Sequence, residues 1–341
     1  MIGHYSIWNA LAFGAIVIVA LIVDLFAHKA DKPISMRDAA LWSAFWVALS
    51  LGFAWYVGAT HGADDAYLFL AGYTLEKALS VDNLFVFIAI FSAFSIKDAF
   101  QHRVLYYGIL GALVMRVIFV ALGTSILQMF DKWALTAFGL FVLWSAWKMW
   151  KQSREESAEI VDYSHHWAVK MTQKFFPVHP QLVGHNFFTR VDGVLKCTPL
   201  FLCLVVIEIA DVMFAFDSVP AVIAVTRDPF LVYTSNIFAI LGLRSLYFLL
   251  AGANRFLVHL EKSVIAVLAF IGVKMLVTVA ADIHMPPLVS LAIVLGLLAF
   301  GIVASFIWPA KEEEQEPVPG EQQAPSEESL PDSAEKKPED E

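Results

Sequence analysis

Five carboxylates interrupt long apolar stretches of this 341-residue sequence: Glu76, Asp82, Glu208, Asp211 and Asp217. A charged side chain near the centre of a membrane-spanning helix costs about 2.5–3.5 kcal/mol on insertion scales. Acids at this cost need a cation, a proton or a basic partner. We therefore expect them to face the interior of the protein and to bind one of these.

Two of the acids are followed directly by another oxygen-bearing side chain, as Asp82-Asn83 and Asp217-Ser218. Carboxylate, amide and hydroxyl oxygens suit hard cations such as Mn²⁺, Mg²⁺ and Ca²⁺, and no Cys or His adjoins them to favour Zn²⁺ or Cu⁺. These four residues predict a metal site near the membrane midplane. The remaining acids, Glu76, Glu208 and Asp211, are expected to serve as access or proton-relay groups.

Helix geometry leaves two arrangements of these acids open. Residues six apart on a regular helix differ by about 240° around the axis and about 9 Å along it, so neither Glu76 with Asp82 nor Asp211 with Asp217 can hold one ion together. Pro220 removes a helical hydrogen bond close to Asp217 and could interrupt that helix. Either broken helices bring the acids together, or regular helices place them as successive stations along a path.

Three further polar residues lie deep in apolar stretches. Arg116 and Arg244 are expected to neutralise the acids when no metal is bound, or to exclude cations at one gate. Asn236 is expected to act as an auxiliary ligand or as a helix cap.

The composition indicates lipid as the solvent. The chain is 59% hydrophobic and 16% charged with a mean hydropathy of +0.67, whereas soluble proteins are roughly 25% charged. The net charge of -9 comes from the acidic end of the chain, and the rest is neutral. No basic surface for nucleic acid and no phosphate-binding loop G-x-x-x-x-G-K-[ST] is found, so we expect a membrane protein that is not an enzyme, binds no nucleic acid and holds no permanent cofactor.

About nine apolar stretches predict an all-α polytopic membrane domain over residues 1–308. A polar connection with several histidines spans about 151–198 and is interpreted as a cytoplasmic loop, and the Glu/Pro/Ser-rich tail 309–341 is predicted to be disordered. Basic residues gather in alternate loops, which places the N-terminus outside and the C-terminus in the cytoplasm. The predicted spans are 7–27, 39–59, 66–94, 104–128, 133–150, 199–226, 231–251, 262–281 and 286–308.

An internal repeat relates about 66–150 to about 199–281. Glu76 and Asp82 recur as Asp211 and Asp217, 135 residues later, and Ile-Leu-Gly at 109–111 recurs at 240–242. Each unit contains three predicted spans, so the two units thread the membrane in opposite directions. Inverted repeats around a midplane site are typical of secondary transporters.

The sequence resembles the TerC/Alx family of bacterial membrane proteins over about residues 5–308. The resemblance is carried by three motifs: Glu76-Lys-Ala-Leu-Ser-Val-Asp-Asn83, Glu208-Ile-Ala-Asp211 continuing to Phe-Ala-Phe-Asp-Ser-Val-Pro-Ala at 214–221, and Thr-Ser-Asn-Ile-Phe-Ala-Ile-Leu-Gly-Leu-Arg-Ser at 234–245. It implies Mn²⁺ export from the cytoplasm across the inner membrane, with the same five acids as functional residues. Some members are named for tellurium resistance.

Two other functions compete with transport. A membrane scaffold or subunit of a resistance complex would bind metal through the same acids without moving it. An intramembrane aspartyl protease would use two aspartates that share a proton, but its Gly-Asp signature is absent because Ala210 and Phe216 precede Asp211 and Asp217.

Overall fold

The computed structural model describes residues 5, 7–27, 35–154, 167–191, 193–253, 259–283 and 285–308. The predicted tail 309–341 and part of the predicted loop, including His165 and His166, lie outside the described residues. At Asp82 the structure describes the backbone, whereas the predicted ligand side chain lies outside the description.

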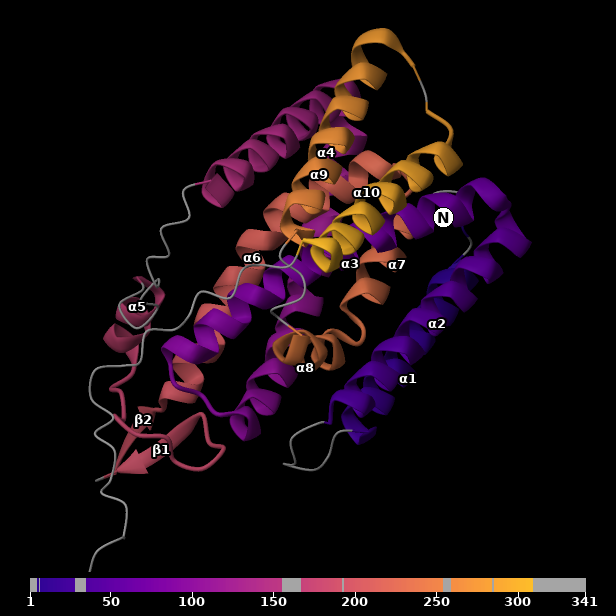
Figure 1. Cartoon of the computed structure of the whole chain (residues 1–341). Helices are drawn as coiled ribbons and strands as arrows, with labels where there is room; N and C mark the ends of the chain where they lie inside the picture. Colours follow the sequence, from indigo (N-terminus) through magenta and orange to yellow (C-terminus); the bar gives the residue numbers. More distant parts are fainter. Residues whose placement is uncertain are drawn as a thin grey trace, which may run out of the picture. The chain divides into compact units, whose positions relative to one another are not determined.

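Almost all regular structure in the described part of the chain is helical, which agrees with the predicted all-α membrane class (Figure 1). A short antiparallel hairpin is the exception: β1 (Phe188–Val191) pairs with β2 (Val194–Cys197) within the predicted loop. The helices are α1 (Ile7–Ala27), α2 (Met36–His61), α3 (Ala63–Ala93), α4 (Asp98–Arg154), α5 (Trp167–Phe175), α6 (Pro199–Val225), α7 (Pro229–Ile240), α8 (Leu243–Ala253), α9 (Leu260–Ala281) and α10 (Pro287–Ile307).

Among the described residues, five helices are long and apolar enough to cross a membrane, and the bent pair of α7 and α8 would make a sixth. This supports a multi-pass membrane protein, but it is fewer than the nine predicted spans. The difference has three origins: α4 covers two predicted spans, charged side chains such as Glu76 and Lys77 interrupt the apolar run of α3, and the apolar part of α1, Leu11–Val23, is short.

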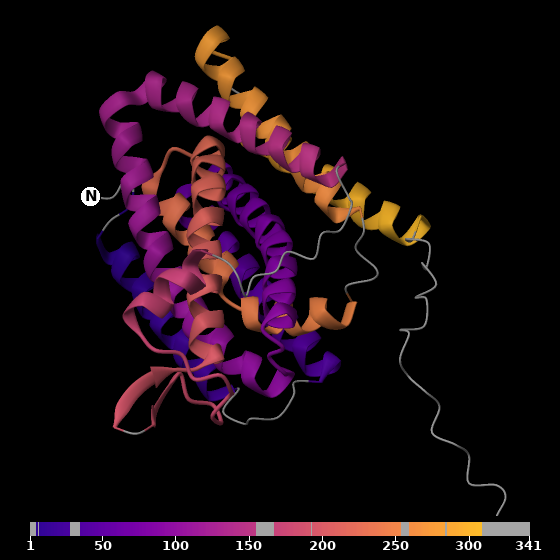
Figure 2. The ribbon, with the colours of Figure 1, turned by 90° about the vertical axis from the view of Figure 1, so that its left-hand side faces the viewer.

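Helix α4 bends sharply at Asp131, where φ is 32° and ψ is -106°. The bend falls in the gap between the predicted spans 104–128 and 133–150. Figure 2 shows the second half of α4 turning away from the first and running beside α9. The two halves of α4 therefore act as separate packing units.

Pro220, which the sequence left as one possible point of interruption, lies inside α6, and the helix continues to Val225. The break lies instead between α7 and α8. Gly242 adopts a φ of 78° there, and the two helices meet at an angle of 47°.

The helices that carry the acids run in opposite directions. α4 runs parallel to α6, because Gly111 lies against Glu208 and Gly123 against Ile223 further along both helices. α4 reverses the direction of α3 after a short connection, so α3 and α6 are antiparallel. They pack against each other, while α4 packs on α6 and α9, and α3 on α7. An internal repeat threaded in opposite directions would produce this pattern, although the repeat itself stays a prediction.

Candidate functional site

A buried polar network joins α3, α4 and α7. Arg116 Nη1 of α4 donates a hydrogen bond to Glu76 Oε1 of α3 and another, of 3.0 Å, to Asn236 Oδ1 of α7. Exposure is 0% for Glu76, 2% for Arg116 and 0% for Asn236. Arg116 is therefore a countercharge for one predicted acid, and Asn236 orients the guanidinium.

Asp211 of α6 adds a second carboxylate to the same arginine. It is 6% exposed and interacts electrostatically with Arg116. One guanidinium thus faces two buried carboxylates, and with both ionised the cluster carries an excess negative charge. Uncompensated charge away from water is strongly unfavourable, so two carboxylates on one guanidinium favour the binding of a proton or a further cation.

Several buried oxygens in this region are left without a hydrogen-bond partner within the described structure. They are Glu76 Oε2, Asp211 Oδ2, Ser80 Oγ and Ser218 Oγ. A buried polar atom that lacks a partner costs about 1–3 kcal/mol. These oxygens are consequently available to bind a proton, a water molecule or a metal ion.

Glu208 lies one helical turn before Asp211 on the same face of α6. Its carboxylate packs against the α-carbon of Gly111 so closely that a Cβ at this position would collide with it. Glu208 is partly exposed and interacts electrostatically with Asp211. Glycine at 111 thus gives a third carboxylate the room to approach the network.

Asp217 has different neighbours from Asp211. Its Oδ1 accepts a hydrogen bond of 2.8 Å from Ser145 Oγ, in the second half of α4, and Lys148 interacts with it electrostatically. Asp217 is partly exposed, whereas the adjacent Ser218 is 1% exposed. The two aspartates of α6 therefore stand at separate levels.

The register between α3 and α6 relates the acids of the two helices. A Cβ at Gly72 would lie 3.4 Å from Val222 Cγ1. Counting about 1.5 Å per residue in opposite directions from this contact places Asp82 near the depth of Asp211, and Glu76 near that of Asp217. The backbone of Asp82 therefore lies near the depth of Asp211, and the predicted grouping of Asp82 and Asn83 with Asp217 and Ser218 stays a prediction.

The choice between a single ligand shell and successive stations stays open, because the Asp82 side chain lies outside the described structure. Within the part of the chain that the structure describes, no three His, Cys, Asp or Glu side chains are close enough to hold a metal ion together. Asn83 is 8% exposed on α3, and Arg244 is buried at the start of α8 beside the helix break. Along α6, Asp211 and Asp217 thus lie at two depths of the helix bundle.

Two residues that the sequence did not single out take part in this region. Lys77 Nζ of α3 donates hydrogen bonds to the backbone oxygens of Ala239, at 3.0 Å, and Leu241, at 3.2 Å. The cost of burying its charge is a signal that could have found it. Ser145 has no such signal, because an isolated serine in an apolar helix is common.

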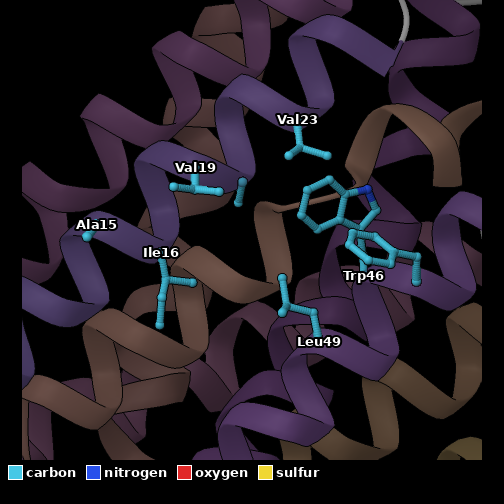
Figure 3. Close-up of a pocket in the computed structure, with 8 residues that line it drawn as sticks. Ala15, Ile16, Val19, Val23, Trp46 and Leu49 are labelled. Atoms are coloured by element: carbon cyan, nitrogen blue, oxygen red, sulfur yellow. The ribbon is translucent and has the colours of Figure 1, made fainter.

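The cavity between α1 and α2 has none of this chemistry. Figure 3 shows Ile16 and Val19 of α1 together with Trp46 and Leu49 of α2 around it. The lining of this space of ≈ 370 Å³ contains no charged side chain. It suits hydrocarbon and gives a cation no ligands.

Comparison with known proteins agrees with the predicted integral membrane class. The profile described as "Integral membrane protein TerC family" matches residues 61–313. The chain is 47% identical over 334 residues to a protein of Serratia marcescens named "Tellurium resistance protein TerC", which covers 90% of this chain and 96% of the relative. It is 41% identical over 310 residues to the "Putative membrane-bound redox modulator Alx" of Escherichia coli K12, covering 89% and 94%.

A third relative is the "Uncharacterized membrane protein STKORF319" of Myxococcus xanthus, 41% identical over 307 residues. This match covers 90% of the present chain and 93% of the relative. No solved structure matches the chain. Since the profile and these relatives cover most of the sequence, the chain belongs to the TerC family of integral membrane proteins.

Proposed function

We propose that this protein is a secondary transporter that exports a divalent metal ion, Mn²⁺ first, from the cytoplasm. The observation that carries the proposal is the buried cluster in which Glu76 and Asp211 share the single guanidinium of Arg116. Its excess negative charge is neutralised either by a proton or by a metal ion. Exchange of one for the other at the same carboxylates is the elementary step of a proton–metal antiporter.

The choice of metal rests on ligand chemistry and on the family. Carboxylate, amide and hydroxyl oxygens at Asp211, Asn83 and Ser218 favour hard cations. The sequence motifs resemble those of a family associated with Mn²⁺ export. The transported ion would first pass Glu208. It would then pass the depth of Asp82 and Asp211 and continue to the depth of Glu76 and Asp217.

The proposal includes a topology. We count α4 as two spans, divided at Asp131, and the α7–α8 pair as one span, which gives nine spans in total. In this topology the N-terminus lies outside and the C-terminus lies in the cytoplasm of a bacterial inner membrane. Two oppositely threaded units then meet at the acidic cluster. Such units can rock against each other and expose the acids alternately to the two sides.

A scaffold that binds metal without moving it is the second candidate. It is favoured by the ion pair between Glu76 and Arg116, which holds α3 and α4 together and can serve stability alone. The name of the relative from Serratia marcescens, a tellurium resistance protein, fits a part in a stress-response complex equally well.

Cellular manganese content separates export from other functions. A bacterial strain that lacks its own manganese exporters would carry the wild type, Asp217→Asn or the matched control Asp131→Asn, whose side chain is 68% exposed. The wild type and the control should lower cellular manganese, whereas Asp217→Asn should leave it at the level of the empty strain despite equal protein abundance. Full export by Asp217→Asn would remove this residue from the path.

A further inference from the structure

The break between α7 and α8 exposes backbone carbonyl oxygens inside the helix bundle. α7 ends at Ile240, Leu241 has an extended ψ of 129°, and the chain turns at Gly242. The last carbonyls of a helix have no donor within the helix, and the negative end of its dipole lies there. The break is thus a position where a cation is favoured.

A lysine from a distant part of the sequence fills this position. Lys77 Nζ lies 3.0 Å from the oxygen of Ala239 and 3.2 Å from that of Leu241. The preceding residue, Glu76, is engaged by Arg116 instead. The ammonium of Lys77 therefore sits against backbone dipoles, in the manner of a coordinated cation.

The shape of the break is set by packing on its other side. Gly242 has a φ of 78°, and any Cβ there would collide with the indole of Trp46, which is 1% exposed. Trp46 belongs to α2. Packing of Trp46 against Gly242 thus supports the shape of the break in addition to the hydrogen bonds of Lys77.

We propose that the α7–α8 break is a binding site for a monovalent cation, and that the tethered ammonium of Lys77 occupies it in this conformation. Carbonyl dipoles stabilise a cation without neutralising it, so two of them suit a charge of +1 better than a divalent ion, which needs carboxylates. A small free ammonium or alkali ion takes the place of the tethered one when the lysine side chain is shortened. This inference does not depend on the transported ion.

The site has a structural consequence for the bundle. Consecutive residues of α3 attach it to two partners, Glu76 to α4 through Arg116 and Lys77 to the end of α7. Movement of α3 relative to α7 must draw the ammonium out of the break. The occupied site therefore stabilises the present arrangement of α3 and α7.

The test uses the purified full-length protein in detergent. Lys77→Ala, the wild type and the exposed-lysine control Lys170→Ala are unfolded by heat in equal concentrations of methylammonium, sodium or N-methylglucamine chloride. The midpoint of thermal unfolding of Lys77→Ala should rise by about 2 °C in methylammonium or sodium relative to the bulky cation, as expected for a tenfold excess over Kd. The other two proteins should respond equally to all three salts.

An equal response of Lys77→Ala to the three salts would overturn the proposal. Lys77→Met keeps the length of the side chain without its charge, and a Met variant as stable as the wild type would overturn it as well. Failure of the Ala variant to fold in every salt would do the same, because a free cation would then not replace the tethered one. Recovery of folded Lys77→Ala only in the small cations would support it.

Discussion

Removal of the Arg116 charge should destabilise the protein more than removal of the Glu76 charge. Arg116 is 2% exposed, binds Glu76 and Asn236, and interacts with Asp211. Arg116→Gln leaves two buried carboxylates without the guanidinium that they share, and breaking a buried ion pair in this way costs about 3–5 kcal/mol. Glu76→Gln leaves Arg116 with Asp211 and Asn236, so its cost should be about 1–3 kcal/mol, that of a disrupted buried hydrogen bond.

The free energy of unfolding would be measured by titration with sodium dodecyl sulfate in mixed micelles. The double variant Glu76→Gln/Arg116→Gln should be more stable than Arg116→Gln alone, since only Asp211 then remains uncompensated. Contacting residues show coupling energies of about 0.5–3 kcal/mol in such cycles. Arg227→Gln is the control, because Arg227 Nη1 lies 3.7 Å from Asp131 Oδ1 and the Arg227 side chain is 49% exposed. This substitution should change the free energy of unfolding by less than about 1 kcal/mol.

The reasoning would be refuted if the free energy of unfolding of Arg116→Gln lay within about 1 kcal/mol of that of the wild type. Such a difference is well below the range for a broken buried ion pair. Simple addition of the two single effects in the double variant would refute it too. In either case the guanidinium would not be the shared countercharge of the cluster.

Three further changes test other parts of the structure. Gly111→Ala should cost about 1–3 kcal/mol through overpacking against Glu208, and thermal unfolding should show the cost relieved in a Glu208→Ala background; an unrelieved cost would contradict the close contact. Asp228→Ala should cost about 1 kcal/mol, because Asp228 caps α7 by accepting from the Phe230 and Leu231 amides at 2.8 and 3.3 Å; an unchanged midpoint would contradict that role. Burial raises the pKa of the Cys197 thiol. Its alkylation at pH 8, followed by mass spectrometry, should therefore be slower than in the unfolded chain and should accelerate as pH rises. Because the unfolded chain loses this proton at a lower pH than the folded protein, stability should fall as pH rises above the ordinary thiol pKa. Equal alkylation rates in folded and unfolded protein would contradict the burial.

The helices were predictable from the sequence because their apolar stretches are long, and the bend of α4 at Asp131 falls in the gap between two of them. Pro220 was a misleading signal, since α6 accommodates it without ending. The actual break carries the tripeptide Ile-Leu-Gly at 240–242, and the same tripeptide at 109–111 lies within a continuous helix. Local sequence therefore cannot decide between the two conformations.

Tertiary packing makes that decision. Gly111 faces the carboxylate of Glu208 and remains helical, whereas Gly242 faces Trp46 and adopts a positive φ. The same limit applies to the acids. Their burial cost identifies them in the sequence, but the partner of Arg116 and the depth of Asp82 relative to Asp211 depend on the register of α3 against α6, which no local pattern encodes.

Manganese flux into sealed proteoliposomes tests the central claim most directly. Vesicles that contain the wild type or the exposed-acid control Asp131→Asn should take up Mn²⁺ faster than protein-free vesicles, and those with Asp211→Asn should not. Uptake by the wild type no faster than by protein-free vesicles, or full uptake by Asp211→Asn, would contradict transport through the carboxylates that share Arg116.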